Sequence, residues 1–129
     1  MKIRDEYTCP LEVAHDIIKG KWKSIILWQL KEGPVSLSML EHGISGISQK
    51  MLLEQLKELR DFGIVSKRNS KGYPLHVEYF LTEDRGNKII PALEILQSIG
   101  VDYMIEHEMT AFLDEKGIIY TNRYPQKSK

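Results

Sequence analysis

Polar side chains that could contact a nucleic acid gather at the start of a segment with helical periodicity. Ser48, Gln49 and Lys50 begin the segment, and Lys57 lies two turns further along the same face. A glutamine can form paired hydrogen bonds with adenine, and a lysine can contact guanine or a phosphate. Ser48 or its backbone N–H can hold a phosphate, although capping a helix is the commoner role of such a serine. We therefore predict a DNA-contacting helix face, with a merely solvated surface as the alternative.

A second polar group falls on a segment whose composition predicts a β-hairpin. Residues 64–68 and 77–81 are rich in strand formers, and residues 69–74 between them are dense in turn formers. The side chains that we expect to lie beside a DNA backbone or minor groove are Lys67, Arg68, Lys71 and His76. The alternative is that these charges only keep the edge of a sheet soluble.

These two groups need a scaffold that places a helix beside a hairpin. The periodicity predicts helices at about 8–19 and 21–31, a small strand at 35–37, helices at about 38–42 and 48–61, the hairpin, and a last helix capped by Thr82. Leu52, Leu56 and Leu59 form the inward face of the helix that Ser48 begins. The expected fold class is mainly α with a small β-hairpin (α+β), arranged as a winged helix-turn-helix.

The bulk properties fit a soluble protein with one core. We expect residues 1–129 to form a single winged-helix domain with a loose tail at about 124–129. No apolar run approaches the ~20 residues that span a bilayer, and the first residues lack the apolar stretch of a signal peptide. We therefore expect a cytoplasmic protein without a membrane partner, and the single cysteine, Cys9, agrees because it cannot form an intrachain disulfide.

The residue patterns that would support catalysis are missing. We find no paired acid and base, no phosphate-binding loop and no metal cluster. The histidines do not have the spacing of metal ligands. They are His15, His42, His76 and His107. We expect neither an enzyme nor a cofactor.

The formal net charge is zero, but the charges are unevenly distributed along the chain. Lysine and arginine outnumber acids between residues 45 and 76, and acids outnumber them between residues 83 and 115. Such a chain can present one surface to phosphates and keep another away from them. Ordinary solvation of helix faces explains the same distribution, so charge alone does not decide between the two.

The last helix, whose main part spans about 87–113, carries more apolar surface than one packing face needs. This surplus predicts a dimer. The residues of this helix that we assign to the dimer interface are Ile89, Leu93, Leu96, Ile99 and Tyr103.

Several blocks in a fixed order resemble the HxlR family of bacterial winged-helix regulators, which are relatives of the MarR group. The matching blocks are Cys9-Pro10, Gly20-Lys21-Trp22, Gly33-Pro34, Ile47-Ser48-Gln49-Lys50-Met51-Leu52, Leu56-Lys57-Glu58-Leu59, Gly63-Ile64-Val65, Val77-Glu78-Tyr79 and Leu81-Thr82. The resemblance implies a homodimer joined by the last helix and the helix at about 8–19, which carries Leu11. It also implies that the Ser48 helix enters the major groove.

The chain departs from the family pattern at two places. The family usually carries an Arg-Phe-x-Glu segment shortly after Gly33-Pro34, where this chain has Ser36-Leu37-Ser38-Met39. A basic contact is therefore missing there. The interval from Thr82 to Gly86 is also one residue longer than the family pattern, which shifts the expected start of the last helix by about a residue.

Cys9 stands at the start of the first predicted helix, where the helix dipole favours a thiolate. Some members of the resembled family sense oxidants through a cysteine at this place, which implies a redox-sensing role for Cys9. Lys2, Arg4 and Lys23 would support the thiolate if they fold close to it. The alternative is an inert small residue.

Three functional hypotheses follow. The first is a sequence-specific regulator that binds double-stranded DNA as a homodimer, and the second is a winged-helix module that binds protein without DNA. The third adds a thiol switch or a small-molecule or oxidant effector to the first.

Overall fold

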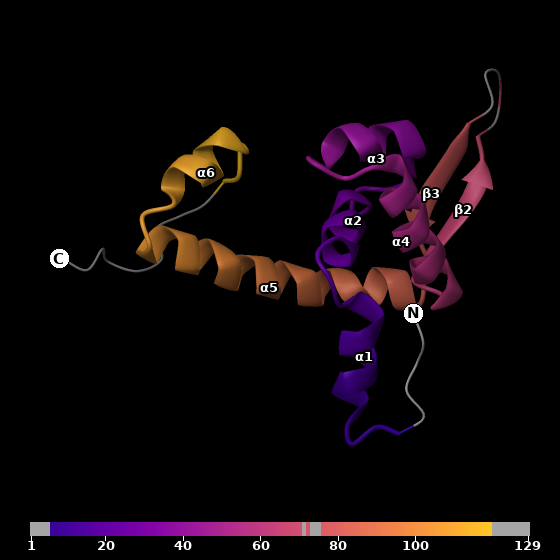
Figure 1. The fold of residues 1–129 in the computed structure, drawn as a ribbon, viewed down its shortest axis with the longest axis horizontal. Coiled ribbons are helices and arrows are strands. Elements are labelled where there is room, and N and C mark those ends of the chain that lie inside the picture. The colour runs from indigo at the N-terminus through magenta and orange to yellow at the C-terminus, as the bar shows by residue number, and fades with distance from the viewer. Residues whose placement is uncertain (1–5, 71, 73–75, 120–129) are drawn as a thin grey trace. The chain divides into compact units, whose positions relative to one another are not determined.

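The computed structural model describes residues 6–70, 72 and 76–119 (Figure 1). The elements in chain order are α1 Pro10–Ile18, α2 Lys23–Gln29, β1 Val35–Ser36, α3 Leu37–Gly43, α4 Gln49–Asp61, β2 Val65–Asn69, β3 Val77–Leu81, α5 Arg85–Glu106 and α6 Thr110–Glu115. The predicted combination of helices with a small β-hairpin is confirmed. The predicted tail at 124–129 lies outside the described residues.

The chain divides into two compact units, residues 1–90 and 91–129, with the boundary inside α5. The first unit contains the helix-turn-helix and the sheet. The second contains the rest of α5 and α6. Over the described ranges, no helix is both long and apolar enough to cross a membrane.

The helix-turn-helix consists of α3 and α4, and serines begin both helices. Ser36 Oγ accepts a hydrogen bond from the Met39 backbone N–H at 3.2 Å. Ser48 Oγ accepts one from the Met51 backbone N–H at 3.1 Å, as expected for a helix cap. The predicted start and end of α4 are therefore confirmed.

The core of the first unit is built mainly by α2 and α4, which contact each other. Leu52, Leu56 and Leu59 of α4 are fully buried, which confirms the inward face predicted from their spacing. Ile26 and Leu27 of α2 are also fully buried. Burial of these side chains is worth roughly 1.5–3 kcal/mol each and fixes α4 against the body of the unit.

The three strands form an antiparallel sheet in the order β1-β3-β2. The β2–β3 register pairs Val65 with Leu81 and Arg68 with Glu78. The small strand expected after Gly33-Pro34 is present as β1, which pairs with β3. The sheet therefore ties the segment before α3 to the hairpin that follows α4, and Figure 1 shows the hairpin beside α3 and α4.

The last long helix begins at Arg85, slightly later than a cap at Thr82 implies. Thr82 Oγ1 still accepts a hydrogen bond from the Gly86 backbone N–H at 2.9 Å and donates one to the Gly63 carbonyl at 2.7 Å. The backbone N–H of Arg85 beside the Asp84 carboxylate lowers the pKa of Asp84. Thr82 therefore joins α5 to the base of the hairpin instead of only capping the helix.

The expected helix at about 87–113 is interrupted in the second unit. Glu108 adopts a positive φ of 59°, and the Met109 N–H bonds to the Met104 carbonyl at 2.7 Å. A residue in the left-handed region followed by this hydrogen bond is a common way for a helix to end. Residues from Thr110 onward then form the separate helix α6.

Candidate nucleic-acid interface

The first turn of α4 presents Gln49 and Lys50 to solvent, because both side chains are exposed. Ser48 is exposed as well, but its hydroxyl already caps the helix. Neither Gln49 nor Lys50 has a hydrogen-bond or ion-pair partner among the residues that the structure describes. Their polar groups are therefore available to an external ligand.

Lys57 is also exposed, but it already has a partner. Its ammonium lies 3.0 Å from a carboxylate oxygen of Asp61, one turn further along α4. Such an exposed pair is worth only ~0.3–0.5 kcal/mol. A DNA phosphate could therefore take the place of the Asp61 carboxylate as the partner of Lys57 at small cost. The carboxylate remains nearby, however, and repels the phosphate.

The hairpin presents Lys67 and Arg68 on β2, and both are exposed. Arg68 Nε lies 3.5 Å from Glu78 Oε1, and the guanidinium lies 5.2 Å from the centre of the Phe80 ring. Among the described side chains, Lys67 has no ion-pair partner. Lys71, the third predicted contact of the hairpin, lies outside the described residues.

His76 is held where β3 leaves the loop of the hairpin by Ser70, which is buried. The His76 N–H donates to Ser70 Oγ at 3.0 Å, and the Ser70 N–H donates to the His76 carbonyl at 2.7 Å. The imidazole Nδ1 also lies 3.1 Å from Ser70 Oγ. The sequence marked Ser70 only as a turn residue, so its role in positioning His76 was not predicted.

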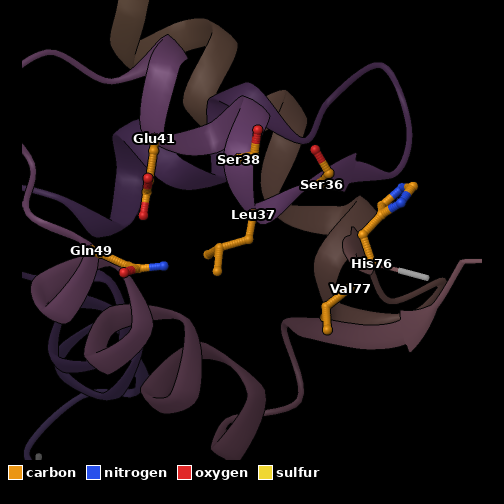
Figure 2. Close-up of a pocket in the computed structure, with 7 residues that line it drawn as sticks. All are labelled: Ser36, Leu37, Ser38, Glu41, Gln49, His76 and Val77. Atoms are coloured by element: carbon orange, nitrogen blue, oxygen red, sulfur yellow. The ribbon is translucent and has the colours of Figure 1, made fainter. Parts of the chain in front are cut away.

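A groove of about 450 Å³ connects the helix-turn-helix with the hairpin (Figure 2). Its lining residues are Ser36, Leu37, Ser38, Glu41, Gln49, His76 and Val77. The groove therefore brings together Gln49 and His76, which the sequence assigned to the same surface from distant positions. Glu41 was not predicted, because an acid on a short helix has no sequence signal that separates it from a solvated residue.

The ammonium of Lys23 fixes the inner side of α4. Lys23 is 3% exposed, and its Nζ lies 2.7 Å from Gln55 Oε1 and 2.5 Å from Glu58 Oε2. The hydrogen bond from Lys23 lowers the pKa of the Glu58 carboxyl. The sequence led us to expect that Lys23 supports the Cys9 thiolate. Its ammonium instead bonds to Gln55 and Glu58 and so joins α2 to α4.

Cys9 is exposed and is the N-cap residue of α1, without a side-chain capping bond. The Thr8 backbone N–H donates to a Glu12 carboxylate oxygen at 2.9 Å, so an acid covers the first turn beside the cysteine. Lys2 and Arg4 lie outside the described residues. Oxidants can therefore reach the sulfur, but the described side chains around it do not form a basic cluster.

The predicted dimer residues differ in their exposure within the single chain. Leu11 of α1 is 75% exposed and Ile89 is half-buried. In the second unit, Leu96, Ile99 and Tyr103 are 55–60% exposed, whereas Leu93 is 5% exposed. Leu93 thus already packs within the chain, while its three neighbours on α5 remain uncovered.

Comparisons with known proteins agree with this arrangement. The family model described as HxlR-like helix-turn-helix matches residues 17–108, which leaves Cys9 and Leu11 outside the match. The chain is 41% identical to an uncharacterized HTH-type transcriptional regulator of Methanothermobacter thermautotrophicus over 99 residues, or 77% of this chain and 75% of the relative.

Two solved structures share the fold. A MarR-family transcriptional regulator of Porphyromonas gingivalis W83 is 34% identical with a TM-score of 0.69, covering 79% of this chain and 98% of that structure. HypR, described as a redox regulator and solved in its reduced form, is 34% identical with a TM-score of 0.66, covering 71% of this chain and 90% of that structure. These relatives are described as transcriptional or redox regulators, and the winged-helix prediction is confirmed.

Proposed function

We propose that this chain, which belongs to the HxlR-like helix-turn-helix family, is a sequence-specific DNA-binding transcriptional regulator that acts as a homodimer. The observation that carries the proposal is the exposed pair Gln49 and Lys50 at the capped start of α4. A helix fits the major groove of B-DNA, and its first residues reach the base edges. Gln49 then reads a base, and Lys50 contacts a base or a phosphate.

The hairpin supplies contacts that do not depend on sequence. Lys67 and Arg68 approach the phosphates or the minor groove, and His76 lies where the hairpin meets the groove of Figure 2. Such contacts fix the orientation of a protein on the duplex without reading its sequence. Ser48, Lys57 and Lys71 complete the proposed set of contacts.

A dimer would read two half-sites about 34–36 Å apart. The support for a dimer is the exposed apolar surface of Leu96, Ile99 and Tyr103 on α5. Single exposed apolar residues are common on protein surfaces, but several on one helix indicate a surface that a partner covers. Leu11 on α1 adds a further exposed apolar side chain. The partner that we propose is a second copy of this chain.

Redox regulation through Cys9 is a further part of the proposal. Its support is the exposed thiol and the similarity to HypR, which is described as a redox regulator. Oxidation to a disulfide across the dimer, or with a small thiol, would change the DNA-binding geometry. A thiol oxidant should change the DNA affinity of the wild type but not of Cys9→Ser. An equal response of both proteins would remove Cys9 from the mechanism.

Selection from a random duplex library tests DNA binding directly. The protein should enrich a motif with two half-sites, and its affinity for the enriched duplex should fall steeply with salt. Lys116→Ala, which removes the lysine directly after α6, serves as a control that should bind like the wild type. Absence of any enriched motif would instead favour a winged-helix module that binds protein.

A further inference from the structure

One large apolar side chain of α4 does not belong to the core. Leu53 is 41% exposed, whereas Leu52, Leu56 and Leu59 of the same helix are fully buried. A single exposed leucine is common on protein surfaces and indicates no site by itself. Its place on the helix decides what it can contact.

Leu53 lies among the residues of α4 that we assign to DNA. It follows Gln49 by four positions and Lys50 by three, and it precedes Lys57 by four. Residues three or four positions apart are neighbours on the surface of a helix. All three neighbours are exposed, so the proposed DNA-contacting surface has an apolar side chain between its polar ones.

A leucine on such a surface matches one group of the major groove. The edges of the bases there are mostly polar, and the C5 methyl group of thymine is their apolar group. A leucine side chain neither donates nor accepts hydrogen bonds, so it cannot satisfy an amino group or a carbonyl oxygen that it covers. Contact with the thymine methyl instead removes two apolar surfaces from water. Four residues span about 6 Å along a helix, so Leu53 would lie over a base near the one that Gln49 reads.

We propose that Leu53 is a specificity-determining residue that contacts the C5 methyl group of a thymine in the operator. The inference rests on the proposed DNA-binding function and adds an apolar reader to the polar ones on α4. Cytosine at the same position would lose water from its N4 amino group without gaining a hydrogen bond. The contact therefore favours thymine over cytosine.

Deoxyuridine tests this contact, because it lacks only the methyl group of thymidine. Library selection first gives the motif that the wild type enriches, and each thymine of the motif is then replaced singly by deoxyuridine. At one thymine of each half-site, the replacement should weaken binding by the wild type roughly 3- to 5-fold. Fluorescence anisotropy of labelled duplexes at one fixed salt concentration gives the affinities.

Substitutions of Leu53 show whether this residue senses the methyl group. Leu53→Ala should bind the thymine duplex and the corresponding deoxyuridine duplex with equal affinity. Leu53→Met keeps an apolar side chain of similar volume and should retain most of the difference. Ile25→Ala removes a side chain of α2 that is 40% exposed, and it should retain the full wild-type difference.

The outcomes separate this inference from the proposed function. A wild type that enriches no motif overturns both. A motif that lacks thymine, or in which deoxyuridine replaces every thymine without loss of affinity, overturns the role of Leu53 alone. The same holds if Leu53→Ala retains the wild-type difference between the two duplexes. Circular dichroism of each variant ensures that folded proteins are compared.

Discussion

The cationic side chains of the interface differ in whether they already have a partner. Lys57 is paired with Asp61, and Arg68 lies beside Glu78, whereas Lys67 has no such acid among the described residues. A paired cation must exchange its acid for a phosphate, so its net contribution to DNA binding is smaller. Among these cations, we therefore expect the unpaired Lys67 to contribute more to DNA affinity than the paired Lys57 and Arg68.

This difference predicts unequal effects of two lysine substitutions on the salt dependence of DNA binding. Lys67→Ala should reduce the slope of log affinity against log salt by about 0.9, the value for one lost phosphate contact. Lys57→Ala should reduce the slope by less, because Asp61 partly neutralises the ammonium. Fluorescence anisotropy of a labelled duplex at several salt concentrations measures both slopes, and equal reductions would contradict the account.

The bond between Lys23 and Glu58 predicts a loss of stability in acid. The lowered pKa of Glu58 in the folded state means that folding favours its carboxylate form. Its contribution is complete above the ordinary glutamate pKa of about 4.3 and is lost as the pH falls through the lower folded value.

The free energy of unfolding, measured by urea titration at several pH values, should therefore fall below about pH 4. Glu58→Gln removes the titrating group and should flatten part of that decline. Identical pH dependence in the two proteins would show that the pair does not contribute through this ionisation.

At the scale of elements, the repeating patterns were predictable and the single contacts were not. The leucines of α4 and the cap at Ser48 predicted this helix because they repeat or sit at a fixed offset. Lys23 and Ser70 act through hydrogen bonds that form only when the chain is folded. Their residue types are equally common on a solvated surface, so periodicity does not distinguish them.

The helix ends show the same limit. Thr82 was predicted as a cap, but its bonds to Gly63 and Gly86 depend on how closely α5 approaches the hairpin. The break at Glu108 depends on a positive φ of a residue other than glycine, which sequence patterns rarely reveal. The number of elements was therefore underestimated by the one helix α6.

The junction of α5 with the hairpin predicts a sharp difference between two glycines. A Cβ at Gly86 would lie 2.4 Å from the Ile64 carbonyl oxygen, so Gly86→Ala should lower the free energy of unfolding by roughly 1–3 kcal/mol. A Cβ at Gly100, further along α5, meets nothing within 4 Å. Gly100→Ala should be neutral or stabilising because alanine favours helices. Thermal or urea unfolding measures the stability of both variants. If Gly86→Ala is as stable as Gly100→Ala, the close approach of Gly86 to Ile64 is refuted.

For the whole molecule, the zero net charge does not oppose DNA binding, because the charges are separated along the sequence. The acidic stretch from 83 to 115 contains the apolar residues that we assign to the dimer. The acids and the proposed dimer residues of α5 therefore share one stretch of the chain, and the cations Lys50 and Lys67 lie in another.

The dimer makes a direct prediction for an exposed residue of α5. Ile99 is 60% exposed, so Ile99→Asp should cost the single chain little but should place a charge in the proposed interface. Light scattering should change from a dimeric mass to a monomeric one. Gln97→Asp adds the same charge to an exposed position of the same helix and serves as the control. A wild-type protein that is already monomeric at micromolar concentration would contradict the dimer.

The most direct test of the whole account is the specificity ratio of the double variant Gln49→Ala/Lys50→Ala. This ratio compares the affinity for the enriched duplex with the affinity for a scrambled duplex of the same length and salt. Each base contact is worth about 1–3 kcal/mol, so the ratio should fall at least about 10-fold. A ratio equal to that of the wild type would mean that the start of α4 does not read DNA.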